Sequence, residues 1–230
     1  MPDFVQLTTL NRRELIRGLA LGLTAIGSLD LEAAQHVHEE AAKTAAGGVY
    51  KPKALTSSEY KTVERLAEII VPKDEVSGRA KEAGAGPFID LLCSQNQTLA
   101  DIYHGGLAWF DAEMNHRAGK TFLEASEAEQ TSMLDVLVAA EREENARRAE
   151  ELVYRRSPDY KGFSGYTTRR SSGLGPGVKF FDWVRKMSID AFYTSPMGVK
   201  DVGYIGNRAY TKYEVPQAAI DYAMSRSPFK

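Results

Sequence analysis

Residues 55–72 read LTSSEYKTVERLAEIIVP, and this stretch carries the strongest helix signal in the chain. Thr56 and Glu59 have the Thr-x-x-Glu spacing of a capping box, in which each side chain accepts a hydrogen bond from the other residue's backbone N–H. Apolar residues then recur every three or four positions as far as Pro72, which cannot continue a helix. The stretch therefore predicts a helix over residues 57–71 with one buried face.

Apolar periodicity predicts further helices downstream of this one. Residues 87–119 contain two helical stretches, and we expect a helix break at the pair Gly105 and Gly106. A second capping box, Ser-x-x-Glu at residues 126–129, opens a long helix. Residues 179–193 place a run of apolar side chains along one helical stripe. That stripe consists of Phe180, Phe181, Val184, Met187 and Phe192.

No segment alternates apolar and polar residues over a length that would predict a strand. We therefore expect an all-α fold, an irregular bundle of five or six helices with long Gly- and Tyr-rich loops and an extended C-terminal tail. We interpret residues 31–54 as a linker, 55–194 as the helical domain and 195–230 as an irregular, partner-binding tail. Within the helical domain, residues 156–178 form a loop insertion, because they contain five glycines and two prolines.

The first 30 residues have the layout of a secretory signal, with a polar start followed by a short apolar stretch. About a dozen apolar residues follow the basic start, fewer than the roughly 20 that a membrane-spanning helix needs. The basic start fits the twin-arginine pathway, which exports folded proteins. An ordinary amphipathic helix is the alternative. Cleavage near residues 42–48 and retention of the segment both stay open. The export pattern consists of Arg12, Arg13, Leu15, Ile16 and Arg17.

The net charge and the cysteine count exclude some classes of function. The 230 residues carry a formal net charge of -2, so the chain lacks the sequence-wide positive field that nucleic-acid binding requires. A single cysteine, Cys93, excludes an internal disulfide and a cysteine-based zinc or iron–sulfur site built from this chain alone. Leu91 and Leu92 directly precede Cys93, and we expect it to be a buried, inert thiol.

A search for catalytic and metal-binding motifs finds weak signals. Glu113-x-x-His116 has the spacing found in helical di-iron sites, but those sites need two such motifs and two further glutamates. His36-x-His38 lies in the expected linker. We therefore expect no catalytic, cofactor-binding or metal-binding residue on this chain. The alternative is a free-standing exported helical metal-binding protein or enzyme that uses Glu113 and His116.

Aromatic residues are concentrated in the C-terminal part of the chain. Eight of the eleven tyrosines lie between residue 154 and the C-terminus, mostly in segments without helical periodicity. Tyrosine is favoured at protein interfaces, so we expect these segments and the neighbouring helix to bind a partner. The alternative is that the tail packs on its own bundle. The predicted partner-binding residues are Tyr166, Phe180, Phe181, Trp183, Phe192, Tyr193, Tyr204, Tyr210 and Tyr213.

Several motifs occur in an order that resembles the gluconate 2-dehydrogenase subunit 3 family, over roughly residues 55–206. Residues 195–201, SPMGVKD, depart from the Pro-x-Tyr-Gly-Gly-Asn of many relatives, which leaves the partner subtype and the sugar open. The motifs are LTSSEYKTVERLAEIIVPKDEVSGRAKEAGAGPFID, GLAWFD, FLEASEAEQTSML, KFFDWVRKMSIDAFYTSP and GYIG.

The resemblance implies a small, gamma-type subunit of a bacterial FAD-dependent sugar dehydrogenase. In such complexes a large subunit of the glucose-methanol-choline type binds FAD and oxidises the sugar, and a cytochrome c subunit often receives the electrons. The expected cofactors are therefore none on this chain, FAD on the large partner, and haem c or an iron–sulfur group elsewhere in the complex.

The resemblance also implies a role for the export signal. A large partner without its own signal would have to cross the membrane bound to this subunit, through an interface that survives transport. We expect a non-catalytic, periplasmic subunit that acts as export carrier, chaperone and stabiliser, with the twin-arginine translocase as a transient partner. Membrane association would come from the complex or from an uncleaved signal. A scaffold for an unrelated exported protein is a further alternative.

Overall fold

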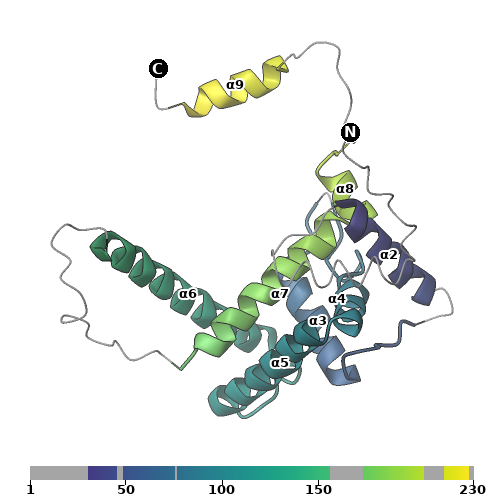
Figure 1. The fold of residues 1–230 in the computed structure, drawn as a ribbon, viewed down its shortest axis with the longest axis vertical. Helices are drawn as coiled ribbons and strands as arrows, with labels where there is room; N and C mark the ends of the chain where they lie inside the picture. The colour runs from purple at the N-terminus through teal and green to yellow at the C-terminus, as the bar shows by residue number, and fades with distance from the viewer. Residues whose placement is uncertain (1–30, 46–48, 76, 156–172, 205–214, 228–230) are drawn as a thin grey trace, which may run out of the picture.

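The computed structural model describes residues 31–45, 49–75, 77–155, 173–204 and 215–227 of the chain. Every regular element within these ranges is a helix, which confirms the predicted all-α class (Figure 1). The helices are α2 (Leu31–Ala45), α3 (Ser57–Ile70), α4 (Ala85–Gln95), α5 (Gln97–Ala118), α6 (Glu127–Arg155), α7 (Gly175–Tyr193), α8 (Pro196–Asp201) and α9 (Gln217–Arg226).

Helix α7 lies at the centre of the bundle and packs against α3, α4, α5, α6 and α8 (Figure 1). Its first turn contains Pro176, a residue favoured there because its fixed φ suits a helix start. The predicted apolar stripe of this helix is buried throughout, and Ser188 and Ala191 are buried beside it. Because neighbours cover α7 on several sides, its sequence is apolar over more than the one face of a surface helix.

The capping box at the start of α3 is present as predicted. The backbone N–H of Glu59 donates to Thr56 Oγ1 at 3.3 Å, and that of Thr56 donates to Glu59 Oε2 at 2.8 Å. The second carboxylate oxygen of Glu59 lies 2.7 Å from Nδ1 of His104 on α5. One glutamate therefore both caps α3 and links it to α5. The second predicted capping box, between Ser126 and Glu129, also forms.

The helix break expected at Gly105 and Gly106 is wrong, because α5 runs unbroken through both residues. A Cβ added to Gly106 would lie 2.1 Å from the ring of Phe180, so this glycine lets α7 approach α5 closely. The break falls instead at Asn96, between α4 and α5. The Asn96 side chain accepts a hydrogen bond from the backbone N–H of Leu99 and caps α5.

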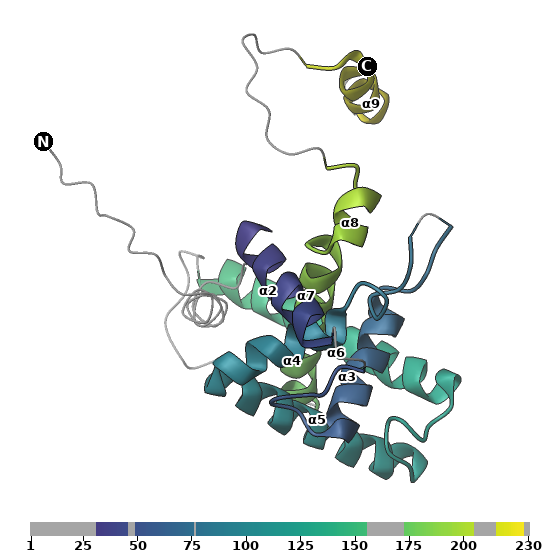
Figure 2. The same ribbon diagram turned by 90° about the vertical axis from the view of Figure 1, so that its right-hand side faces the viewer.

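Within residues 31–54, interpreted as a linker, the described parts 31–45 and 49–54 pack on the helical body. Helix α2 occupies the first part and packs against α4 (Figure 2). Its buried residues Ala34, Val37 and Ala41 recur at helical spacing, although their small side chains give a composition that resembles a linker.

Residues 50–55, which lead into α3, are held by hydrogen bonds to Asp90 on α4. The Asp90 side chain is fully buried. Its carboxylate accepts four hydrogen bonds from the segment that precedes α3. One comes from the Tyr50 hydroxyl at 2.8 Å. The others come from the backbone N–H groups of Lys53 at 2.7 Å, Ala54 at 3.1 Å and Leu55 at 2.8 Å.

The C-terminal tail is more helical than predicted. Within the residues expected to be irregular, 196–201 form α8 and 217–226 form α9. Ser195 caps α8 by accepting a hydrogen bond from the backbone N–H of Gly198. Helix α9 lies apart from the other helices in both views (Figures 1 and 2). Most of the expected loop insertion lies outside the described residues, and α7 begins before its predicted end at residue 178.

Candidate interaction surface

The exposed apolar side chains of the described residues are concentrated near the C-terminus. Ten large apolar side chains are exposed among all the described residues, and eight of them come from residues 189–224. Single exposed apolar residues are normal on soluble proteins, whereas a contiguous group marks an interaction site. The eight are Ile189, Tyr193, Val202, Tyr204, Val215, Ile220, Tyr222 and Met224.

Four of these residues lie in the last turns of α7 or just after α8, and we call Ile189, Tyr193, Val202 and Tyr204 the α7–α8 surface. Ile189 and Tyr193 are four residues apart on α7, so their side chains are neighbours on one side of that helix. Val202 and Tyr204 directly follow α8, which packs against α7. The four side chains are between 39% and 58% exposed, enough to offer apolar area to another molecule.

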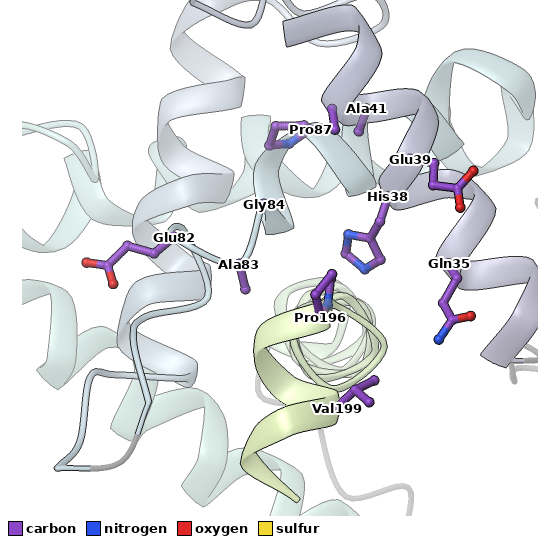
Figure 3. Close-up of a pocket in the computed structure, with 11 residues that line it drawn as sticks. Gln35, His38, Glu39, Ala41, Glu82, Ala83, Gly84, Pro87, Pro196 and Val199 are labelled. Atoms are coloured by element: carbon purple, nitrogen blue, oxygen red, sulfur yellow. The ribbon is translucent and has the colours of Figure 1, made fainter. Parts of the chain in front are cut away.

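Helix α8 also forms one wall of an open pocket of about 580 Å³ (Figure 3). The other walls come from α2, the residues just before α4, and the first turn of α4. Glu39 and Glu82 lie on opposite sides of this pocket, and His38 points toward its centre (Figure 3). Most of the lining is hydrocarbon. The lining residues are Gln35, His38, Glu39, Ala41, Ala42, Glu82, Ala83, Gly84, Pro87, Pro196 and Val199.

The imidazole of His38 is held in place by α4 and α7. Its ring centroid lies 4.6 Å from that of Phe88, and its Nε2 lies 3.1 Å from Thr194 Oγ1. The Thr194 hydroxyl also donates to the carbonyl of Asp190 at 2.6 Å. Burial lowers the pKa of His38 from 6.5 to about 4. His38 is therefore neutral near pH 7 and serves as a packed wall of the pocket.

The predicted partner-binding residues that the structure describes are in buried, partly buried and exposed positions. Phe180, Phe181 and Phe192 are buried in the chain's own core, so their rings offer almost no exposed area to a partner in this structure. Phe180 makes edge-on ring contacts with Tyr103 and Phe110 of α5, and these rings fill the space between α5 and α7.

The other predicted residues are partly buried, exposed or outside the described residues. Trp183 is partly buried against the core, whereas Tyr193 and Tyr204 are exposed. Sequence reasoning missed Ile189 and Val202. Ile189 could have been found from its four-residue spacing to Tyr193 outside the buried stripe. The remaining site residues lie outside the described residues. They are Tyr166, Tyr210, Tyr213, Arg12, Arg13, Leu15, Ile16 and Arg17.

The candidate metal residues are not brought together. Glu113 accepts a hydrogen bond from Arg117 Nε at 2.7 Å, and His116 is exposed on the same helix. His36 lies 3.8 Å from Glu39 on the surface, whereas His38 points inward. Within the described ranges, no group of three or more His, Cys, Asp or Glu side chains could hold a metal ion. The same ranges contain no helix with both the length and the apolar character needed to cross a membrane.

Comparison with known proteins gives one match. Neither the curated proteins nor the solved structures include a match to the chain. A sequence model of the gluconate 2-dehydrogenase subunit 3 family matches residues 57–214. The match begins at the first residue of α3, covers α3 to α8 and includes the α7–α8 surface. The chain therefore belongs to the gluconate 2-dehydrogenase subunit 3 family.

Proposed function

We propose that the chain is the non-catalytic small subunit of a periplasmic FAD-dependent sugar or polyol dehydrogenase, of the gluconate, glucose or glucoside type. Family membership supports the general part of this proposal, which is an accessory subunit with a partner dehydrogenase subunit. In the proposal, FAD is bound by a large partner of the glucose-methanol-choline type. A cytochrome c subunit, with haem c, or an iron–sulfur group accepts the electrons. The small subunit carries the partner through the twin-arginine translocase and stabilises it.

The α7–α8 surface is the observation that supports a binding role most directly. Its residues lie before and after α8 in the chain, and α8 itself lines the pocket. Six of the eleven residues that line the pocket are Ala, Pro or Val, so its walls offer mostly apolar contact area. An apolar surface beside a hydrocarbon-lined pocket suits an apolar anchor from a protein partner.

Substitution of the surface tests the binding role. We expect Ile189→Ser with Tyr193→Ser to lower the affinity for the co-expressed large subunit about tenfold or more, because buried interface anchors contribute 1 to 2 kcal/mol or more each. The measurement is the amount of flavin that co-purifies with the tagged small subunit. Leu123→Ser is a matched control, because Leu123 is exposed but lies before α6. Unchanged co-purification in the double variant would contradict the proposed surface.

The export role is tested separately at the twin arginines. Arg12→Lys with Arg13→Lys keeps the charge and removes the arginine pair, so the large subunit should remain in the cytoplasm. Arg142→Lys, at an exposed arginine on α6, is the control for a charge-conserving change outside the export pattern. Dehydrogenase activity is then compared between periplasmic and cytoplasmic fractions. Periplasmic activity equal to that of the wild type in the double variant would refute the carrier role.

A further inference from the structure

Helix α9 is exposed along its whole length. None of its ten residues is buried, and both views place it away from the helical body (Figures 1 and 2). A helix of this length spans about 15 Å. Isolated helices shorter than about 12 residues are marginal in water, because few hydrogen bonds offset the cost of nucleation. A persistent α9 therefore needs a surface to pack against.

The residues of α9 divide into a narrow polar stripe and a wide apolar face. Gln217, Asp221 and Ser225 recur every four residues, and Gln217 Nε2 donates to Asp221 Oδ1 at 2.8 Å. Most of the remaining circumference is apolar. A face this wide is better covered by a groove than by a flat surface. The apolar residues are Ala218, Ala219, Ile220, Tyr222, Ala223 and Met224.

The large side chains of α9 have the character of interface anchors. Ile220, Tyr222 and Met224 are between 40% and 63% exposed. The guanidinium of Arg226 lies 4.7 Å from the centre of the Tyr222 ring, which places one positive charge at the C-terminal end of the apolar face. A complementary groove would be apolar along its length and would carry a carboxylate at one end.

Helix α9 is tethered to the α7–α8 surface. Residues 202–216 connect the end of α8 to the start of α9, and a chain of this length reaches at most about 50 Å. Exposed apolar residues lie at both ends of this connection, with Val202 and Tyr204 after α8 and Val215 before α9. A molecule bound at the α7–α8 surface would meet α9 at an effective concentration in the millimolar range.

We propose that α9 is a second attachment arm, which inserts Ile220, Tyr222 and Met224 into an apolar groove on the large dehydrogenase subunit. This inference rests on the proposed function and adds a binding element to it. These observations favour the large subunit as the molecule that binds α9. Helix α9 is tethered beside the proposed interface, and none of its residues is buried against the rest of the described chain. With two linked contacts, the complex dissociates only when both have opened. Helix α9 therefore acts mainly on the dissociation rate.

The test compares two faces of α9 in the co-expressed complex. Ile220→Ser with Met224→Ser should raise the dissociation rate of the large subunit about tenfold or more, with a change of at most a few-fold in the association rate. Gln217→Ser with Ser225→Ala alters the polar stripe to a matched extent and should leave both rates unchanged. Catalytic activity per bound FAD should be the same in all variants. An unchanged dissociation rate in the first variant would overturn the arm.

A photo-crosslinking residue in place of Tyr222 identifies what α9 contacts. A crosslink to the large subunit supports the proposal, whereas a crosslink to the pocket of the same chain or to a second copy overturns it. The two proposals fail in different ways. If the wild-type chain binds no flavoprotein, the proposed function fails. If it binds one with a dissociation rate that the α9 variants do not change, only the arm fails.

Discussion

The carboxylate of Asp90 accepts all four of its hydrogen bonds from the segment that leads into α3. Asp90→Ala would leave three backbone N–H groups and the Tyr50 hydroxyl without this acceptor, and a buried unsatisfied donor costs about 1 to 3 kcal/mol. We expect the free energy of unfolding to fall by about 3 kcal/mol or more, measured by urea denaturation. Asp101→Ala, at an exposed aspartate on α5, should change it by less than about 0.5 kcal/mol. Equal effects of the two substitutions would contradict this role.

His38 makes stability depend on pH. Its pKa is 6.5 in the unfolded chain and about 4 in the folded one, because burial disfavours the charged imidazole. Between these values the unfolded state binds the proton more readily, so stability is complete above pH 6.5 and declines as the pH falls toward 4. The expected loss from His38 is about 3 kcal/mol over this range.

The contribution of His38 can be isolated by substitution. Urea denaturation between pH 7 and 4 should show a smaller loss of stability for His38→Gln than for the wild type. His116→Gln, at an exposed histidine, should keep the wild-type slope. Parallel slopes in all three proteins would show that His38 does not carry the effect.

Local sequence predicted some residues well and others not at all. The capping pairs are three residues apart and depend only on local spacing, so they were found. The buried state of Cys93 followed from its apolar neighbours and is confirmed. The role of Asp90 could not be predicted, because its partners lie 35 to 40 positions earlier in the chain. The fold alone brings them together.

At the scale of elements, Gly198 determines how α8 sits on α7. A Cβ at this position would lie 2.1 Å from the backbone oxygen of Phe192, and a backbone atom cannot move aside as a side chain can. Gly198→Ala should therefore shift α8 away from α7 at a cost of about 1 to 3 kcal/mol. Because α8 borders the pocket and the α7–α8 surface, binding of the large subunit should weaken as well.

The Gly198 prediction is checked by thermal unfolding and by titration with the large subunit. Gly175→Ala is the control, because its added methyl group would meet open space at the start of α7. If Gly198→Ala binds the large subunit as tightly as the wild type does, the position of α8 does not matter for binding.

Long helices with bulky apolar stripes were predictable, and short or alanine-rich ones were not. Helices α3 and α7 carry large side chains at regular spacing, which identifies a buried face. Helix α2 buries Ala34, Val37 and Ala41, and alanine gives little contrast with polar neighbours. The expected break at Gly106 failed for a different reason. That glycine serves packing between helices, which local sequence does not reveal.

At the scale of the whole molecule, the order of motifs predicted the family, whereas only some of the predicted partner-binding residues are exposed. The many aromatic residues of the C-terminal part suggested a partner, but some of these residues are buried in the core and others are exposed. Three phenylalanines of α7 complete the core, and Tyr193 and Tyr204 remain outside. The pocket was not predictable, because its walls come from α2, α4 and α8, which are distant in sequence.

In the proposed export route, the packing of α2 on α4 also limits how the chain can mature. A peptidase that cut near residues 42–48 would remove α2 and leave its contact area on α4 open to water. A stable secreted product should therefore keep Ala34, Val37 and Ala41, so its new N-terminus should precede residue 34. Intact mass spectrometry of the periplasmic product would locate that end, and a fully folded product that starts after residue 45 would show α2 to be dispensable.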